Sequence, residues 1–126
     1  MSKIKILVVD DEESLTRMLK LNLEETGGFE VKIENQGSNT LTSARDYKPD
    51  LILLDIMMPD MIGSEVAEKM LGDEELKDIK IIFLTALVSK QETEATDGRI
   101  EGRSFIAKPV NIDELIESIE KELNNT

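Results

Sequence analysis

The 126-residue sequence contains no cysteine and no histidine, and each absence excludes a class of protein. Without cysteine the chain cannot build a disulfide framework, which agrees with a reducing compartment. Without histidine, any mechanism that needs a histidine base, nucleophile or metal ligand must take that residue from a partner.

Long apolar runs are also missing. The longest of them are far too short to span a bilayer. The first residues, Met1-Ser2-Lys3-Ile4, lack the apolar stretch and small-residue cleavage site of a signal peptide. A chain of this length is expected to form one domain over residues 1–126 and to bury enough apolar surface to fold alone. We therefore expect a soluble, cytoplasmic protein.

Positive charge is scarce, because 15 lysine and arginine residues face 27 aspartate and glutamate residues, for a net charge of −12. Phosphate contacts need clustered basic residues, so direct binding to nucleic acid is disfavoured. Most of the acidic residues are expected to keep helix faces solvated. Asp10, Asp11 and Asp55 differ from the rest, because each stands at the end of an apolar run.

Apolar runs alternate with helix-period segments along the whole chain, which predicts βαβ units and a parallel sheet. Residues 4–9, 51–54 and 79–84 are almost continuously apolar, as expected of central strands covered on both faces. Residues 29–33 alternate and residues 104–107 are few, so both strands are placed at edges. The expected fold is α/β: a flavodoxin-like, doubly wound, five-stranded parallel sheet of order 2-1-3-4-5, the order already known for flavodoxin.

Five helices are expected to complete the alternation. Apolar residues recur at helical spacing in four segments, residues 13–26, 39–47, 63–71 and 112–123. Asn111 and Glu114 predict a cap pair at the start of the last one. Residues 89–103 contain helix formers but almost no apolar stripe, so a fourth helix there would be short and weakly docked.

Polar groups stand where four of the predicted strands end. Asp10 and Asp11 follow the first apolar run, Asp55 the third, Thr85 the fourth and Lys108 the last. The carboxyl ends of parallel strands meet at one edge, where open α/β sheets bind their ligands. Singly, each residue has an ordinary interpretation: a helix cap, a β-branched strand residue or a surface lysine. Together they predict a site for a divalent metal and a phosphoryl group.

The chemistry of this group is consistent. An ionised Asp55 at the end of an interior strand is costly unless it is paired or bound to metal. Asp11 and Asp55 offer the oxygen ligands that suit Mg²⁺ or Mn²⁺. A carboxylate can also attack phosphorus and form an aspartyl phosphate. Lys108 would offset charge on the phosphoryl oxygens, and Thr85 could donate a hydrogen bond to one of them.

With these residues the chain resembles the receiver domains of two-component response regulators, in the single-domain form of the chemotaxis regulators. The matching elements are Val9-Asp10-Asp11, Asp55-Ile56-Met57-Met58-Pro59 with Gly63 four residues on, Thr85-Ala86, and Lys108-Pro109. They occur in the family's order and spacing and cover essentially the whole chain. The chain is expected to be either a stand-alone receiver or a domain of a longer regulator or hybrid kinase, and Met1 and a last helix that ends in Asn124-Asn125-Thr126 favour the first.

The resemblance implies a role for each residue of the set. Asp55 would be the phosphoacceptor, Asp11 would ligate Mg²⁺ directly, and Asp10 would do so mainly through water. The backbone carbonyl of Met57 would complete the protein's share of the metal shell. Lys108 would contact the phosphoryl group.

The resemblance also implies a switch. Thr85 would move toward the phosphoryl group, and Phe105 stands at the family's aromatic switch position, although it also suits a core strand residue. The bond between Lys108 and Pro109 would be cis.

The resemblance finally implies partners in a phosphorelay. The donor would be a phosphohistidine on a sensor histidine kinase or a phosphotransfer protein, which accounts for the missing histidine. Phosphorylation would switch a surface that binds an unknown downstream protein. The chain would be a signalling domain and not an enzyme, with no membrane partner.

Two positions in the family tune the lifetime of the aspartyl phosphate, and here they are Met57 and Leu87. Neither side chain can hydrogen-bond an attacking water well, so we predict slow hydrolysis without a phosphatase. Gly102-Arg103 stands one residue nearer the lysine than the Gly-Ala that family members often carry. The fourth helix is therefore expected to depart from the family's shape.

Three other functions fit part of this pattern. A haloacid-dehalogenase-type phosphatase uses the same groups but needs a second aspartate where Met57 stands. A flavodoxin-like flavin binder needs a phosphate-binding loop after the first strand, where the four acidic residues 10–13 would repel the phosphate. A structural adaptor would not need the intact acidic set.

Overall fold

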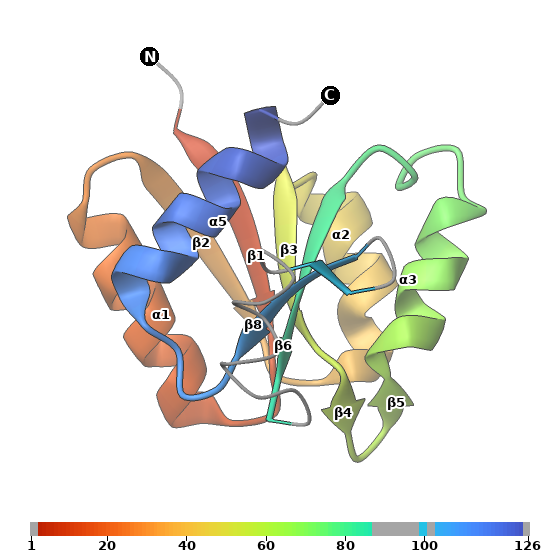
Figure 1. Ribbon diagram of the computed structural model, residues 1–126. Helices are drawn as coiled ribbons and strands as arrows, with labels where there is room; N and C mark the ends of the chain where they lie inside the picture. Colours follow the sequence, from red (N-terminus) through yellow and green to blue (C-terminus); the bar gives the residue numbers. More distant parts are fainter. Residues whose placement is uncertain (1–2, 87–98, 101–102, 125–126) are drawn as a thin grey trace.

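The computed structural model describes residues 3–86, 99–100 and 103–124. Five parallel strands form its central sheet in the order β2-β1-β3-β6-β8, with helices on both faces (Figure 1). The strands are β1 (Ile4–Val9), β2 (Phe29–Glu34), β3 (Leu51–Asp55), β6 (Lys80–Thr85) and β8 (Arg103–Ala107). The flavodoxin-like order 2-1-3-4-5 is confirmed.

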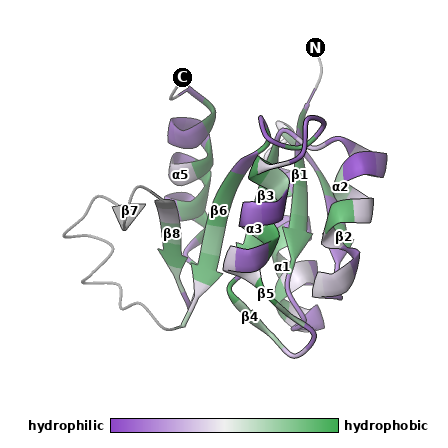
Figure 2. Ribbon diagram, turned by 90° about the vertical axis from the view of Figure 1, so that its right-hand side faces the viewer, coloured by the Kyte–Doolittle hydropathy of each residue, from purple (hydrophilic) through white to green (hydrophobic). Residues whose placement is uncertain are grey.

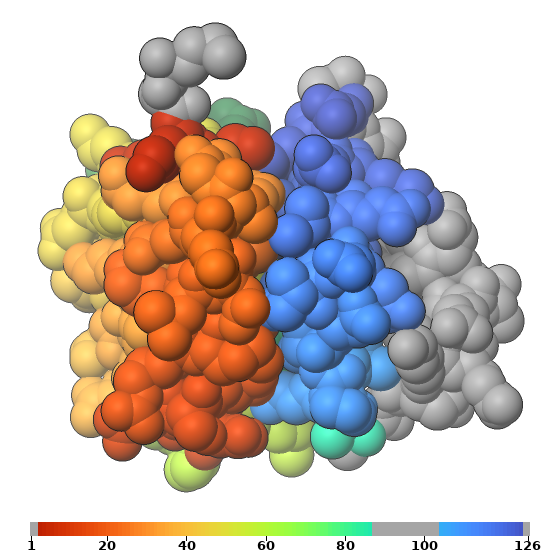
Figure 3. Space-filling model, turned by 90° about the vertical axis from the view of Figure 1, so that its left-hand side faces the viewer, coloured from red at the N-terminus to blue at the C-terminus, as the bar shows by residue number. Residues whose placement is uncertain are grey.

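Helices cover the sheet on both sides. Those in the described part of the chain are α1 (Glu13–Glu25), α2 (Thr40–Tyr47), α3 (Gly63–Leu71) and α5 (Ile112–Asn124), and a short 3-10 helix, η1 (Gly37–Asn39), precedes α2. The helices α1 and α5 lie side by side on one face (Figure 3), and α2 and α3 cover the other. No helix within the described ranges is long and apolar enough to cross a membrane.

The helix ends follow local chemistry. Gly27 has a φ of 85°, a left-handed conformation that glycine adopts without strain, and it ends α1. The carboxamide of Asn111 accepts a hydrogen bond from the backbone N–H of Glu114 at 3.0 Å, so the predicted cap of α5 is confirmed. The predicted helix at residues 39–47 begins one residue later, because Asn39 belongs to η1.

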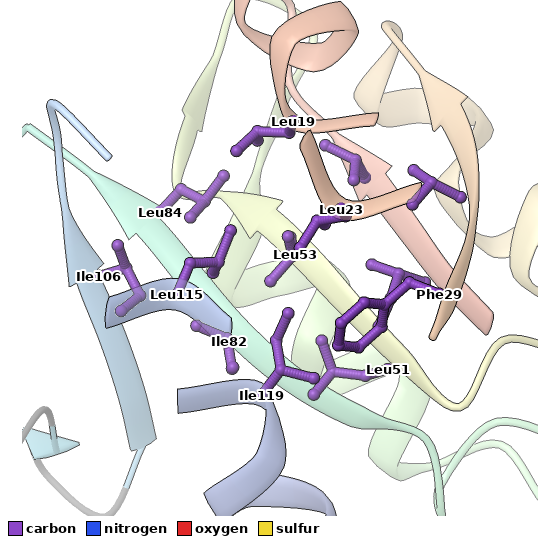
Figure 4. Packing of buried hydrophobic residues seen from close by; sticks show 13 residues of the cluster. Leu19, Leu23, Phe29, Leu51, Leu53, Ile82, Leu84, Ile106, Leu115 and Ile119 are labelled. Atoms are coloured by element: carbon purple, nitrogen blue, oxygen red, sulfur yellow. The ribbon is translucent and has the colours of Figure 1, made fainter. Parts of the chain in front are cut away.

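Two apolar layers join the helices to the sheet. Because successive strand residues point to opposite faces, β1 sends Ile6 and Val8 toward α1 and α5, and Leu7 and Val9 toward α2 and α3. The first layer is shown in Figure 4. Figure 2 shows the consequence, apolar strands between helices that turn polar residues outward. Burial on both faces explains why these strands are continuously apolar in sequence.

The structure differs from the expected elements in two places. A two-residue strand, β7 (Arg99–Ile100), pairs antiparallel with β8, so β8 is not the outermost described strand. The short helix expected within residues 89–103 falls on a segment that lies mostly outside the described residues, and the three residues described there, 99, 100 and 103, belong to strands. A hairpin of β4 (Met57–Met58) and β5 (Met61–Ile62) follows β3 and was not predicted.

Candidate functional site

Four strands end in polar side chains at one edge of the sheet, which is the lower edge in Figure 1. Asp10 directly follows β1, and Asp55 is the last residue of β3. Thr85 is the last residue of β6, and Lys108 directly follows β8. Strands β3 and β6 end at nearly the same level, since Asp55 pairs with Leu84, the residue before Thr85. The topology therefore brings together the side chains that the sequence pattern singled out.

Three carboxylates meet at this edge. Asp10, Asp11 and Asp55 each contribute one oxygen, and these oxygens lie within 4.8 Å of one another. Asp10 is fully buried and Asp55 is 5% exposed, whereas Asp11 is exposed. Carboxylates this close together repel one another, and the repulsion is strong where they are buried, unless a positive charge lies beside them.

Lys108 supplies part of that positive charge. Its ammonium lies 2.8 Å from Asp10 Oδ2 and 3.7 Å from Asp55 Oδ1. Burial disfavours the ammonium, but the contact with Asp10 and the charge of Asp55 raise the pKa of Lys108 above its usual range. Among the described residues Asp10 Oδ2 has no partner with regular hydrogen-bond geometry, so the short contact is chiefly an ion pair.

The charges and the donor atoms fit a divalent cation. One ammonium against three carboxylates leaves two negative charges without a neighbouring counter-charge in this cluster. The donor atoms are all oxygens, the ligand type preferred by Mg²⁺, Mn²⁺ and Ca²⁺. The donor set combines the buried Oδ2 of Asp10 with the exposed carboxylate of Asp11, so one ligand of the set is accessible from solvent.

The carboxyl group of Asp55 is perturbed by its surroundings. Burial and the neighbouring charge of Asp10 raise its pKa to about 6, and Lys108 opposes the rise. The backbone N–H of Met57 lies 3.4 Å from Asp55 Oδ1, a long hydrogen bond. Asp55 is therefore a carboxylate in neutral solution, but one that gains from a cation or a covalent partner.

Asp10 also makes the helix-start contact that a capping residue would make. Its Oδ1 accepts a hydrogen bond from the backbone N–H of Glu12 at 2.9 Å, just before α1 begins. This bond fixes the carboxylate's orientation while Oδ2 faces Lys108. A helix-start contact and a site role are thus combined in one side chain.

Met57 and Gly63 stand at the two ends of the segment that follows Asp55. The Met57 side chain is 59% exposed beside the site. The backbone N–H of Gly63 donates to the carbonyl of Ile56 at 2.7 Å. A Cβ at Gly63 would lie 2.5 Å from the carbonyl oxygen of Asp55, so the chain needs glycine for this close approach.

The remaining predicted residues occupy β6, β8 and the loop after β8. Thr85 is buried, and its carbonyl accepts a hydrogen bond from the backbone N–H of Lys108 at 2.9 Å. The half-buried ring of Phe105 packs on Phe83, with 5.3 Å between ring centroids. The bond between Lys108 and Pro109 is cis, as expected. Leu87 lies outside the described residues.

Two polar residues beside the site were missed in the sequence. Asn35 directly follows β2 and donates to the carbonyl of Asp10 at 2.8 Å. Asp60 stands in the turn of the β4–β5 hairpin and accepts hydrogen bonds from backbone N–H groups of the chain after β2. A search for polar residues after every strand would have found Asn35, whereas nothing local marks Asp60.

Comparisons with known proteins agree with this geometry. The family model described as "Response regulator receiver domain" matches residues 6–120. The polar-differentiation response regulator DivK of Brucella ovis is 36% identical over 121 residues, which are 95% of this chain and 96% of that protein.

Solved structures give the same result. The chemotaxis protein CheY4 of Vibrio cholerae matches with a TM-score of 0.80 at 28% identity, over 96% of this chain and 99% of that one. A CheY-like response regulator receiver domain protein of Methanospirillum hungatei matches with a TM-score of 0.79 at 31% identity, over 98% and 95%.

Proposed function

The chain belongs to the family of response regulator receiver domains, which are phosphoacceptor signalling domains and not conventional enzymes, and we propose that Asp55 is its phosphoacceptor. One observation carries this assignment. Of the three clustered carboxylates, Asp55 is the last residue of the central strand β3, and its Oδ1 lies 3.7 Å from the ammonium of Lys108 in surroundings that raise its pKa to about 6. Asp10 is already engaged by the start of α1 and by the lysine.

We assign the metal site to the same cluster, with Mg²⁺ as the metal and Mn²⁺ as a substitute. Asp11 and Asp55 would contribute carboxylate oxygens, Met57 its backbone carbonyl, and Asp10 a contact mainly through water. A bound Mg²⁺ supplies positive charge that offsets the charge of the transferring phosphoryl oxygens. The support is the oxygen-only donor set and its excess of negative charge.

The transfer itself exchanges one bond for another. An oxygen of Asp55 forms a bond to phosphorus while the bond between phosphorus and the donor's imidazole nitrogen breaks, and that nitrogen takes up a proton. Lys108 holds a phosphoryl oxygen by its charge, and Thr85 donates a hydrogen bond to another oxygen. Movement of Thr85 leaves room for Phe105, now half-buried on Phe83, to turn further inward.

The donor belongs to the histidine kinase class that family membership implies. We propose a phosphohistidine on a sensor kinase or on a phosphotransfer protein, since the chain has no histidine of its own. Output would pass through a protein-binding surface and not through nucleic acid, which the net charge of −12 disfavours. We place this exchange in the cytoplasm and treat residues 1–126 as a single receiver domain, supported by the match over residues 6–120.

Incubation with acetyl phosphate and Mg²⁺, followed by intact mass measurement, tests this function. We expect one added phosphoryl group in the parent protein and none in Asp55→Asn. Asp46→Asn, an exposed change of the same kind on α2, should keep the adduct. Release of phosphate by the parent without an adduct would favour the phosphatase instead, and an adduct retained in Asp55→Asn would assign the acceptor elsewhere.

A further inference from the structure

A loop that carries no metal ligand crosses the edge of the sheet beside the site. It consists of residues 35–38, which follow β2 and include the first two residues of η1, and we call it the β2 loop. Figure 1 shows the chain leaving β2 at the lower edge and running across it to α2, near the β4–β5 hairpin. The helix η1 contacts β5. The β2 loop thus lies between the two segments that hold the proposed metal ligands.

One end of the β2 loop holds the segment after β1. The side-chain amide of Asn35 donates to the carbonyl of Asp10 at 2.8 Å and to Thr16 Oγ1 at 3.0 Å. Thr16 is fully buried in α1, and its hydroxyl donates to the carbonyl of Glu13 at 3.0 Å. Asn35 therefore fixes the backbone at Asp10 and, through it, the orientation of the Asp10–Asp11 pair.

The other end of the β2 loop holds the hairpin. The carboxylate of Asp60 accepts hydrogen bonds from the backbone N–H groups of Gly37 at 3.3 Å and Ser38 at 3.0 Å. These bonds lower the pKa of Asp60, the bond from Ser38 most of all. A Cβ at Gly37 would lie 2.9 Å from the Cε of Met58 and 3.1 Å from the Cβ of Met61, so the loop packs closely against side chains of the hairpin.

The hairpin is also anchored at its opposite end, next to Asp55. There the N–H of Gly63 donates to the carbonyl of Ile56 at 2.7 Å, so the hairpin is held both at its base and at its turn. Met57 is the first residue of β4 and lies between these two anchors. Its carbonyl position therefore depends on Asp60 as well as on β3.

We propose that the β2 loop is a brace between the two ligand-bearing segments, and that it increases the affinity of the site for Mg²⁺ over Ca²⁺. Asn35 and Asp60 are its positioning residues, and neither touches the metal. The inference rests on the proposed function, because it takes Met57 and the Asp10–Asp11 pair as ligands. The physical reason is that Mg²⁺ demands near-ideal octahedral geometry, whereas Ca²⁺ accepts flexible coordination.

Affinity measurements on the full chain test the brace. Binding of Mg²⁺ and Ca²⁺ is measured by isothermal titration calorimetry at constant ionic strength for the parent, Asn35→Ala, Asp60→Ala and the double variant. Loss of an outer-shell partner costs about 10- to 100-fold in metal affinity, so we expect losses toward the lower end of that range for Mg²⁺ and smaller losses for Ca²⁺. The double variant should lose less than the product of the single losses, because either change releases the same brace.

Controls separate positioning from charge and from folding. Asp46→Ala removes one exposed negative charge on α2 and should leave the Mg²⁺ affinity nearly unchanged. Asp60→Asn keeps one acceptor oxygen and should lose less affinity than Asp60→Ala. Thermal unfolding in EDTA reports the structural part of each change.

Three results would overturn the brace. A lower unfolding temperature in EDTA combined with the parent's Mg²⁺ affinity, in both single variants, would make the contacts purely structural. Equal losses for Mg²⁺ and Ca²⁺ would remove the selectivity claim. A parent that accepts no Mg²⁺ and no phosphoryl group would instead overturn the proposed function, and the brace with it.

Discussion

The interior of the sheet and its carboxyl edge are built from the same strands and both contain buried side chains, yet they differ in chemistry. In the interior, Leu7 and Leu53 are fully buried between apolar neighbours. At the edge, Asp10 and Asp55 are 0% and 5% exposed but carry carboxylates. Asp11 completes the group of three carboxylates, and the ammonium of Lys108 is the positive charge that lies beside Asp10 and Asp55.

The difference separates stability from function. Burying apolar surface stabilises the fold by about 25 cal/mol per Å², whereas burying charges of one sign costs free energy unless a counter-charge is present. The raised pKa of Asp55 is a direct sign of that cost. The edge is therefore a region that a cation or a phosphoryl group stabilises, and the interior is one that needs no ligand.

The largest effect is expected from an apolar deletion in the interior. Leu53→Ala removes a side chain buried between β3 and the α1–α5 layer, and we expect a loss of about 2–5 kcal/mol in the free energy of unfolding. Urea denaturation in EDTA measures it. Mg²⁺ affinity of the folded fraction should stay near the parent's, and a comparable loss of affinity would show that the two regions are not separable.

Bound Mg²⁺ should stabilise the protein through the carboxylates of the edge and not through the apolar interior. Mg²⁺ at 100 times its dissociation constant should raise the free energy of unfolding by about 2.7 kcal/mol. Thermal melts with and without EDTA measure the shift. The shift should shrink strongly in Asp11→Asn, which removes an exposed ligand, and persist in Leu53→Ala. An equal shift in Asp11→Asn would remove Asp11 from the metal site.

The edge should also give the metal-free protein a distinct pH dependence. The folded-state pKa of Asp55, about 6, lies above the ordinary 3.8. The folded state therefore binds the proton of Asp55 more tightly than the unfolded state does. The resulting stabilisation is fully present below about pH 4 and is lost as the pH rises through 6, an effect on the order of 2–3 kcal/mol.

Asp55→Asn is the matched variant for this titration. In EDTA at pH 8 it should be more stable than the parent, and its stability should change less between pH 4 and pH 7. Denaturation curves across that range measure both effects. A parent whose stability does not fall on crossing pH 6 would contradict the assigned cost of the buried carboxylate.

The smallest effect is expected at the two predicted tuning positions, Met57, which is exposed beside the site, and Leu87, which lies outside the described residues. Met57→Asn combined with Leu87→Glu introduces groups that can hydrogen-bond an attacking water. The aspartyl phosphate should then hydrolyse several-fold faster, about 1 kcal/mol in the barrier. Loss of the phosphoryl adduct with time measures the rate, and Met57→Leu serves as the apolar control. An unchanged rate in the double variant would end the tuning hypothesis.

Much of the fold was predictable because its signals are local. Continuous apolar runs marked the buried strands β1, β3 and β6, and helix-period stripes marked α1 and α5 to within one or two residues. The segment at residues 89–103 has no apolar stripe, and the short helix expected there lies mostly outside the described residues. The β4–β5 hairpin was missed because two-residue strands have no period to detect.

The sequence by itself determined which chemical groups end each strand, because strand ends and polar residues are read from neighbours along the chain. Only the tertiary structure decided their distances, such as the contact of Lys108 with Asp10 instead of a closer one with Asp55. It also revealed the β2 loop, whose bonds join residues 25 and 23 positions apart. Such contacts depend on how strands are ordered in the sheet, and no local pattern specifies them.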